Sequence, residues 1–163
     1  MNDNKTNKPR DILFHPIHFL SLGLGSGLFP KAPGTAGTVI AVLLYIPLSM
    51  LDLWSYVAVL VVGSLVGIYL CDKTSNALGG HDDPAIVWDE FLGYWLTMLM
   101  APSGWEWILF GFALFRLFDI WKPWPINILD QKVRGGLGIM VDDLAAGAYA
   151  LVVLQLTHYA IYS

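Results

Sequence analysis

Residues 53–71, LWSYVAVLVVGSLVGIYLC, form a run of 19 residues without a charged side chain. At about 1.5 Å of rise per residue, a helix of this length spans roughly 28 Å, close to the ~30 Å hydrocarbon core of a bilayer. A second long apolar run, residues 141–163, opens with Asp142 and Asp143 and then carries only His158 and tyrosines as ionisable groups. These two runs predict two membrane-spanning helices.

Three shorter apolar runs lie at residues 36–51, 86–101 and 105–121. As helices they extend about 24 Å each, which suits either tilted spans in a thinned bilayer or buried helices of a soluble bundle. Composition favours the membrane, because 56% of the residues are hydrophobic and only 13% are charged, whereas soluble domains carry roughly 25% charged residues. We therefore predict an all-α fold: a compact polytopic membrane helical bundle of about five main helices, four or five of them spanning.

The chain before these helices divides into two parts. Residues 1–10, MNDNKTNKPR, are polar and predict a disordered tail, which leaves a single domain over residues 11–163. Residues 12–28 are apolar but are interrupted by one proline and three glycines. This pattern favours a segment lying at the membrane interface over a further span.

Loop charges predict how the bundle is oriented. With five spans, every lysine and arginine except Arg116 falls before the first helix, between the second and third, or between the fourth and fifth. By the positive-inside rule these sectors are cytoplasmic, and only Asp52 and Glu106 among the charged residues lie outside. The net charge of −4 and the scattered bases do not favour a nucleic-acid partner. Nothing in the sequence indicates an obligate protein partner.

The segment FPKAPGTAGT, residues 29–38, comes just before the first main helix. Its Pro-Gly pair predicts a turn, and Thr35 or Thr38 can cap the helix that follows. The free N–H groups of the first helical turn, together with Lys31, would form a cradle for a phosphate. An ordinary turn with a threonine cap explains the same residues without a ligand, so both interpretations stay open.

Four carboxylates fall within nine positions of HDDPAIVWDEFLG, residues 81–93. Helix capping explains Asp82 or Asp83, which precede a proline. It does not explain Asp89 and Glu90, because an ionised residue deep in lipid costs ~2.5 to 3.5 kcal/mol. Grouped carboxylate oxygens suit Mg²⁺, which often bridges to a substrate phosphate. The segment therefore predicts a magnesium site.

The segment FRLFDIWKPWP, residues 115–125, combines both signs of charge. Arg116 and Asp119 are three positions apart, hence on one helical face, and Lys122 follows three positions later. A guanidinium, a carboxylate and an ammonium on one face suit phosphate recognition and metal binding. The competing interpretation is an intrahelical ion pair with a lysine that extends toward water.

The segment GGLGIMVDDLAAG, residues 135–147, places Asp142 and Asp143 at the predicted start of the last helix. One of the two acids can be the N-cap, and both would favour the helix dipole. The second acid is not needed for capping. With Asp89 and Glu90 from another helix start, the pair would complete a carboxylate-rich cation site.

In the same order and at similar separations, these four segments resemble the signature segments of the phosphatidylglycerophosphatase A family. The resemblance extends from about Gly23 to the C-terminus. It implies an all-helical, Mg²⁺-dependent membrane enzyme that converts the lipid phosphatidylglycerophosphate into phosphatidylglycerol and inorganic phosphate. It also implies a multi-pass protein of the bacterial cytoplasmic (inner) membrane, with its site facing the cytoplasm.

The motifs and the resemblance together assign three groups of residues. The predicted Mg²⁺ ligands are Asp82, Asp89, Glu90, Asp119, Asp142 and Asp143. The predicted phosphate-binding residues are Lys31, Thr35, Thr38, Arg116 and Lys122. The predicted catalytic acids are Asp89, Glu90, Asp142 and Asp143. Water and an aspartate both remain possible nucleophiles.

Two other classes of protein compete with the enzyme. A small membrane transporter or ion channel with an acidic cation site would also carry intramembrane carboxylates, but it would distribute them along its spans. A structural or assembly protein would need the apolar faces but not the paired acids. The clean middles of the longest apolar runs favour the enzyme.

Overall fold

The structure is a computed structural model, and it describes residues 7–80 and 83–162. Every regular element in that part of the chain is a helix, as the sequence predicts. In chain order these are α1 (Pro9–Ile12), α2 (Pro16–Ser21), the 3-10 helix η1 (Gly23–Leu28), α3 (Pro33–Leu48), α4 (Leu53–Leu78), α5 (Trp88–Thr97), α6 (Trp105–Trp121), α7 (Ile126–Lys132) and α8 (Gly135–Tyr162).

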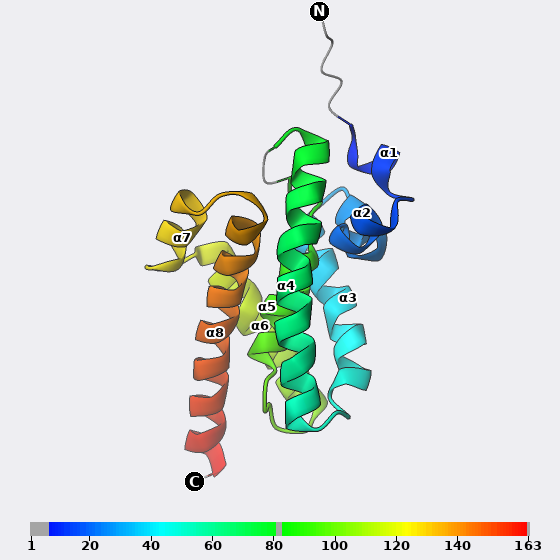
Figure 1. Ribbon diagram of the computed structural model, residues 1–163. Coiled ribbons are helices and arrows are strands. Elements are labelled where there is room, and N and C mark those ends of the chain that lie inside the picture. The colour runs from blue at the N-terminus through cyan, green and yellow to red at the C-terminus, as the bar shows by residue number, and fades with distance from the viewer. Residues whose placement is uncertain (1–6, 81–82, 163) are drawn as a thin grey trace, which may run out of the picture.

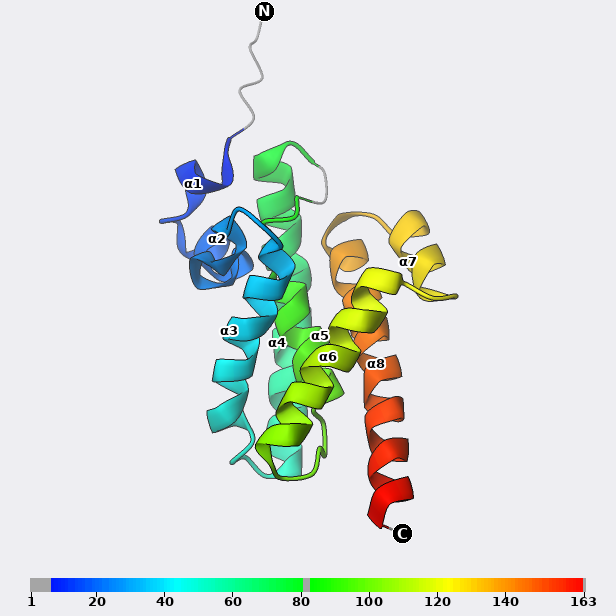
Figure 2. The ribbon, with the colours of Figure 1, turned by 180° about the vertical axis from the view of Figure 1, so that it is seen from behind.

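The short helix α5 lies at the centre of the bundle. It contacts α3, α4, α6 and α8, and eight of its ten residues are buried. The long helices α4 and α8 extend along the molecule, and α6 crosses behind α5 and α8 (Figures 1 and 2). Because α5 is enclosed, its polar residues depend on neighbouring helices rather than on water for partners.

Two helices, α4 and α8, are long and apolar enough to cross a membrane. Only 22% of the most apolar window of α4 is buried inside the protein, and 50% of that of α8. Large side chains such as Val62 and Leu65 on α4 are instead more than half exposed. An apolar surface turned outward is typical of a helix that faces lipid. The finer prediction of four or five spans is not confirmed, since α3 is apolar but shorter.

Several predicted boundaries are confirmed and others need correction. Helix α6 occupies the predicted residues, and α4 begins as predicted but continues to Leu78. Helix α3 begins at Pro33, three residues earlier than predicted, because proline fits the first helical turn. The prediction that Thr35 or Thr38 caps this helix is wrong, since the N-cap position is occupied by Ala32 and no side chain caps it.

The predicted starts of the two acid-bearing helices are also wrong. Helix α8 begins at Gly135, so Asp142 and Asp143 lie two turns inside it instead of at its N-cap. Helix α5 begins at Trp88, and Asp83 stabilises a turn before it by accepting a hydrogen bond from the N–H of Ala85 at 2.9 Å.

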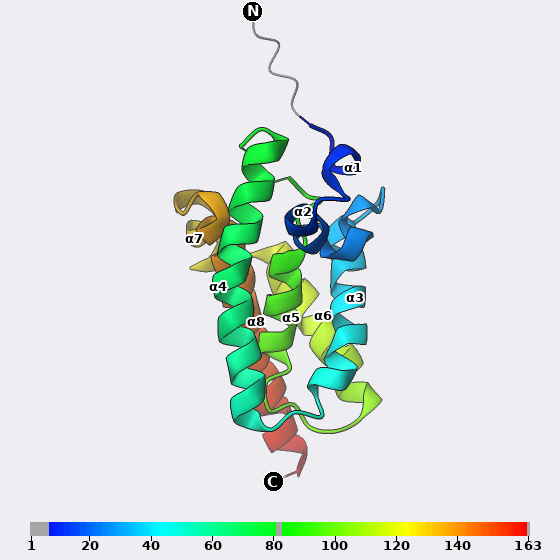
Figure 3. The ribbon, with the colours of Figure 1, turned by 45° about the vertical axis from the view of Figure 1, so that its right-hand side comes forward.

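The first part of the chain contains more helix than predicted. Pro9 and Arg10, assigned to a disordered tail, belong to α1. The predicted interfacial segment consists of α2 and η1, which pack beside α4 and α3 respectively (Figure 3). Helix α7 lies where the sequence predicts only a loop.

Helices α5 and α8 run parallel and touch through glycines. A Cβ atom on Gly147 would overlap the carbonyl of Gly93, and one on Gly93 would lie 2.8 Å from the carbonyl oxygen of Asp143. The hydroxyl of Thr97 donates to the carbonyl of Gly93 at 2.9 Å and to that of Gly147 at 3.4 Å. Because the two backbones are this close, the side chains that lie one turn before these glycines on α5 and α8 are also brought together.

Candidate functional site

Three carboxylates from two helices meet one turn before the glycine contact. Asp89 and Glu90 come from α5 and Asp143 from α8, and one oxygen of each lies within 4.8 Å of the others. They are 8%, 9% and 3% exposed, respectively. We call these three residues the acid cluster. The prediction that an Asp-Glu pair and an Asp-Asp pair meet across two helices is confirmed for three of the four acids.

Two buried oxygens of the acid cluster have no hydrogen-bond partner and could bind a ligand. Buried oxygens Oε2 of Glu90 and Oδ2 of Asp143 accept no hydrogen bond, which is costly for a carboxylate away from water. The three carboxylates also lie close enough together for their negative charges to repel one another. A bound cation would offset both the repulsion and the loss of hydration, so the donor set fits a hard divalent metal.

Arg116 and Asp119 of α6 lie against the acid cluster. The guanidinium of Arg116 pairs with Asp119 at 2.5 Å and lies 3.8 Å from Glu90. The Asp119 carboxylate lies next to that of Asp143, so their negative charges repel. The predicted common face of Arg116 and Asp119 is therefore confirmed, and it faces the acids of α5 and α8.

Lys122 and Asp142 form a separate pair. The ammonium of Lys122 lies 2.6 Å from Asp142 and 2.6 Å from Asp130 of α7. Burial opposes its charge, but the two hydrogen-bonded carboxylates raise the pKa of Lys122 above its usual value and keep it cationic. Lys122 ends α6 in a left-handed conformation, with φ of 44°, which turns the chain toward α7 and α8.

The first turn of α3 reaches the acid cluster through Gly34. A Cβ atom on Gly34 would overlap Oε1 of Glu90 and would lie 3.1 Å from Nη1 of Arg116. Any larger residue at this position would therefore displace one of those two groups. The first sequence motif thus belongs to the site through its backbone.

The side chains of that motif point elsewhere. Lys31 is exposed, and together with Thr35 it lines an apolar cavity of about 610 Å³ on the outside of α3. Thr38 is fully buried and its hydroxyl donates to the carbonyl of Gly34 at 2.8 Å. Of the five residues predicted to bind phosphate, Arg116 contacts the acid cluster, with its Nη1 3.8 Å from Oε1 of Glu90.

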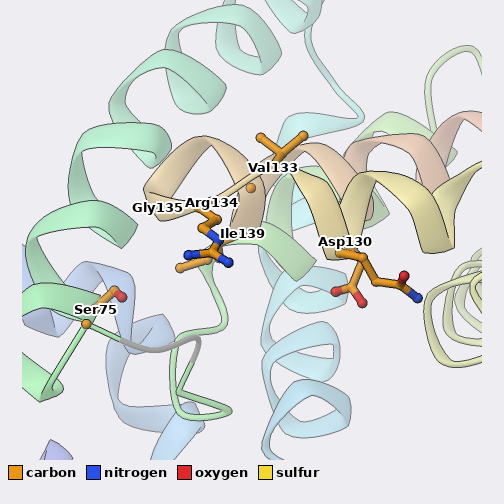
Figure 4. A pocket seen from close by; sticks show the side chains of 9 residues that line it. Ser75, Asp130, Val133, Arg134, Gly135 and Ile139 are labelled. Atoms are coloured by element: carbon orange, nitrogen blue, oxygen red, sulfur yellow. The ribbon is translucent and has the colours of Figure 1, made fainter.

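A more polar cavity of about 420 Å³ lies beside the Lys122 pair, between the end of α4, α7 and the first turns of α8. Figure 4 shows the Arg134 side chain lying between Ser75 of α4 and Asp130 of α7. Gly138 and Ile139 also line this cavity, one turn before Asp142 on α8. Asp130, which lines this cavity, also pairs with Lys122.

Sequence reasoning missed several residues that shape the site. Asp130 was missed because the short, polar helix α7 gives no periodic signal. Gly93 and Gly147 did leave a signal, since each lies four positions after an acid of the cluster, in DEFLG and DLAAG. The predicted metal ligand Asp82 lies outside the described residues.

Comparisons with known proteins give one consistent result. Residues 19–158 match the family model described as Phosphatidylglycerophosphatase A. The Escherichia coli (strain K12) protein of that name is 43% identical over 148 residues, covering 90% of this chain and 86% of the relative. The Haemophilus influenzae protein of the same name is 44% identical and covers 98% of both chains.

A third relative carries a different name. It comes from Bacteroides thetaiotaomicron, has the provisional name phosphatidylinositol-3-phosphatase, and is 36% identical over 91% of this chain and 96% of its own length. No solved structure matches the chain significantly.

Proposed function

Because the chain belongs to the phosphatidylglycerophosphatase A family, we propose that it hydrolyses the terminal phosphomonoester of phosphatidylglycerophosphate, releasing phosphatidylglycerol and inorganic phosphate. The acid cluster of Asp89, Glu90 and Asp143 is the observation that supports this activity and indicates where the active site lies. Family membership does not favour the competing transporter or ion channel. The activity is that of a phosphoric monoester hydrolase in phospholipid synthesis.

Mg²⁺ is the cofactor that the acid cluster fits best. Asp89, Glu90 and Asp143 would hold it, with Asp119 beside them as a further oxygen donor, and the unsatisfied oxygens of Glu90 and Asp143 support this assignment. When bound, such an ion supplies positive charge that stabilises the phosphate oxygens as the leaving group departs. Asp82 stays a proposed ligand from sequence alone.

The remaining charged residues divide into two roles. Arg116 presents the guanidinium nearest to the acid cluster and would bind the phosphate oxygens that the metal does not. Lys122 holds Asp142 at 2.6 Å. Asp142 and Lys122 would therefore position α8 and contribute to catalysis through their own pair, not as direct partners of Glu90.

The nucleophile can be assigned by an isotope experiment. If water attacks, one of the carboxylates of the acid cluster would take up its proton. The P–O bond to the lipid then breaks, and the lipid alkoxide takes up a proton. A substrate analogue with a chiral ¹⁸O-labelled terminal thiophosphate, hydrolysed in ¹⁷O-labelled water, would show inversion at phosphorus if water attacks directly. Net retention would instead assign the attack to an aspartate, because two successive in-line transfers invert the centre twice.

For membrane placement, we propose a multi-pass arrangement in the bacterial cytoplasmic membrane with the acid cluster near the cytoplasmic surface. Helices α4 and α8 run in opposite directions, so the end of α4 and the start of α8 lie on the same side (Figure 1). The lysines and arginines of the predicted cytoplasmic sectors support that side as the inner one. A lipid could then present its head group while its chains stay in the bilayer.

Phosphate release by the purified protein tests the function. Detergent-solubilised protein is given phosphatidylglycerophosphate with Mg²⁺, or with a chelator in its place. We expect release only with the divalent cation, and a lower rate on phosphatidylinositol 3-phosphate offered at the same concentration. No release with any divalent cation would refute the proposed function.

A further inference from the structure

The outer face of α3 carries an apolar groove that the proposed reaction does not use. It has a volume of about 610 Å³ and lies between η1 and α3, lined by Phe29, Ala36, Val39 and Ile40 among others. Phe29 is 59% exposed and Val39 46%. Helix α3 is at the edge of the bundle (Figure 3), so this groove opens toward the surroundings of the protein.

The lining of this groove includes one cation, Lys31. Lys31 lines it and is exposed, and within the described part of the chain Lys31 takes part in none of the ion pairs. Thr35 adds a hydroxyl beside it. An ammonium beside an apolar surface is complementary to a phospholipid, because the charged phosphodiester of the lipid lies next to its hydrocarbon chains.

The groove and the acid cluster are connected through the same short segment. Gly34 lies between Lys31 and Thr35 in sequence order, and its α-carbon packs against Glu90 and Arg116. One side of this turn therefore faces the acids, while the other borders the groove. In phosphatidylglycerophosphate a single glycerol unit separates the terminal phosphate from the phosphodiester, so one molecule can engage both sides.

We propose that the groove binds an acyl chain of the substrate and that Lys31 binds its phosphodiester, while the acid cluster acts on the terminal phosphate. This inference rests on the proposed function. It assigns Lys31 to the inner phosphate, whereas the sequence pattern assigns it to the phosphate that is removed. Such a groove would favour a lipid over a soluble phosphomonoester, because it supplies binding energy that only a chain-bearing substrate can use.

The test compares two substrates with the same head group. One is dioleoyl phosphatidylglycerophosphate in mixed micelles, and the other is its fully deacylated, water-soluble form. Val39→Trp fills the groove from an exposed position, and Ala36→Trp fills it from the adjacent turn. Leu43→Trp is the matched control, because Leu43 is 57% exposed on the same helix but does not line the groove.

We expect Val39→Trp to lower kcat/KM for the lipid about tenfold, the loss expected when about two methylene groups are no longer buried. Its kcat/KM for the deacylated substrate should stay within about twofold of the unaltered enzyme, and Leu43→Trp should leave both values unchanged. Lys31→Gln should lower both values together, since both substrates keep the phosphodiester.

Three results would overturn the inference. These are an equal loss on both substrates with Val39→Trp, no loss on the lipid with either groove variant, or unchanged activity with Lys31→Gln. If the unaltered enzyme hydrolysed neither substrate, the proposed function itself would fail, which distinguishes the two claims. If one groove variant does not fold, the other decides the outcome.

Discussion

The role proposed for each carboxylate of the site follows from the side chain beside it. Glu90 has Arg116 at 3.8 Å and Asp143 has Asp119, whereas Asp142 has Lys122 at 2.6 Å. Adjacent residues of α8 thus differ: Asp143 joins the acid cluster, and Asp142 belongs to an ion pair. The sequence alone cannot tell which of the two aspartates is a metal ligand, because the packing of α8 decides which neighbours each one meets.

Removing one negative charge from the acid cluster should stop catalysis without unfolding the protein. We expect Asp143→Asn to lower phosphate release about 100-fold or more, because the amide keeps the shape but loses the charge that binds the metal. Steady-state assays on purified protein measure this. Glu106→Gln, on an exposed residue at the start of α6, is the control and should retain activity; equal losses in both variants would contradict the assignment.

The Lys122 pair should contribute to stability as well as position. Lys122→Met leaves the buried Asp142 without its cation, and we expect it to lower the free energy of unfolding by about 3 kcal/mol. Asp130→Asn removes the more exposed partner, whose side chain is 38% accessible, and should cost under about 1 kcal/mol. Chemical denaturation in detergent compares the two. A larger loss of stability in Asp130→Asn than in Lys122→Met would contradict the assignment of Lys122 and Asp142 as the main stabilising pair.

At the scale of the helices, the long apolar runs were predictable and the short or glycine-rich ones were not. Hydrophobicity alone gives α6 in full and most of α4. The start of α8 is missed because Gly135, Gly136 and Gly138 have low helix propensity. Tertiary contacts override that propensity: the carboxylate of Asp72 on α4 accepts a hydrogen bond from the N–H of Gly136 at 3.2 Å.

The glycine contact between α5 and α8 should set the geometry of the acid cluster. We expect Gly147→Ala to lower activity about tenfold or more and to destabilise the protein, because the new methyl group would overlap the backbone of Gly93. Gly111→Ala in α6 is the matched control, since its methyl group meets the flexible end of Met98. Activity and thermal unfolding are measured on both. Full activity in Gly147→Ala would mean that the helices can separate without moving the acids.

At the scale of the whole molecule, the residues of the site gather at one end of the bundle. The starts of α3, α5 and α8 meet the end of α6 there (Figures 1 and 2). Counting loop charges predicts that the charged groups share one side. It does not predict which of them touch, because the crossing of α5 and α8 and the turn at Lys122 depend on packing between distant segments.

The proposed orientation can be tested in intact cells. The buried Cys71 is replaced by alanine so that each protein has a single thiol. Single cysteines are then introduced as Asp52→Cys and Lys132→Cys. A membrane-impermeant maleimide should label Asp52→Cys from outside, and should label Lys132→Cys only after the membrane is opened. The reverse pattern would place the acid cluster on the outer side and would contradict the topology.

Direct metal binding tests the central claim, that the acid cluster of α5 and α8 holds the catalytic cation. Mn²⁺ can replace Mg²⁺ as a spectroscopic probe, and the free ion is counted by electron paramagnetic resonance during titration of the purified protein. We expect Glu90→Gln and Asp143→Asn each to weaken Mn²⁺ binding about tenfold or more, and Glu106→Gln to bind like the unaltered protein. Equal affinity in all four proteins would contradict this claim.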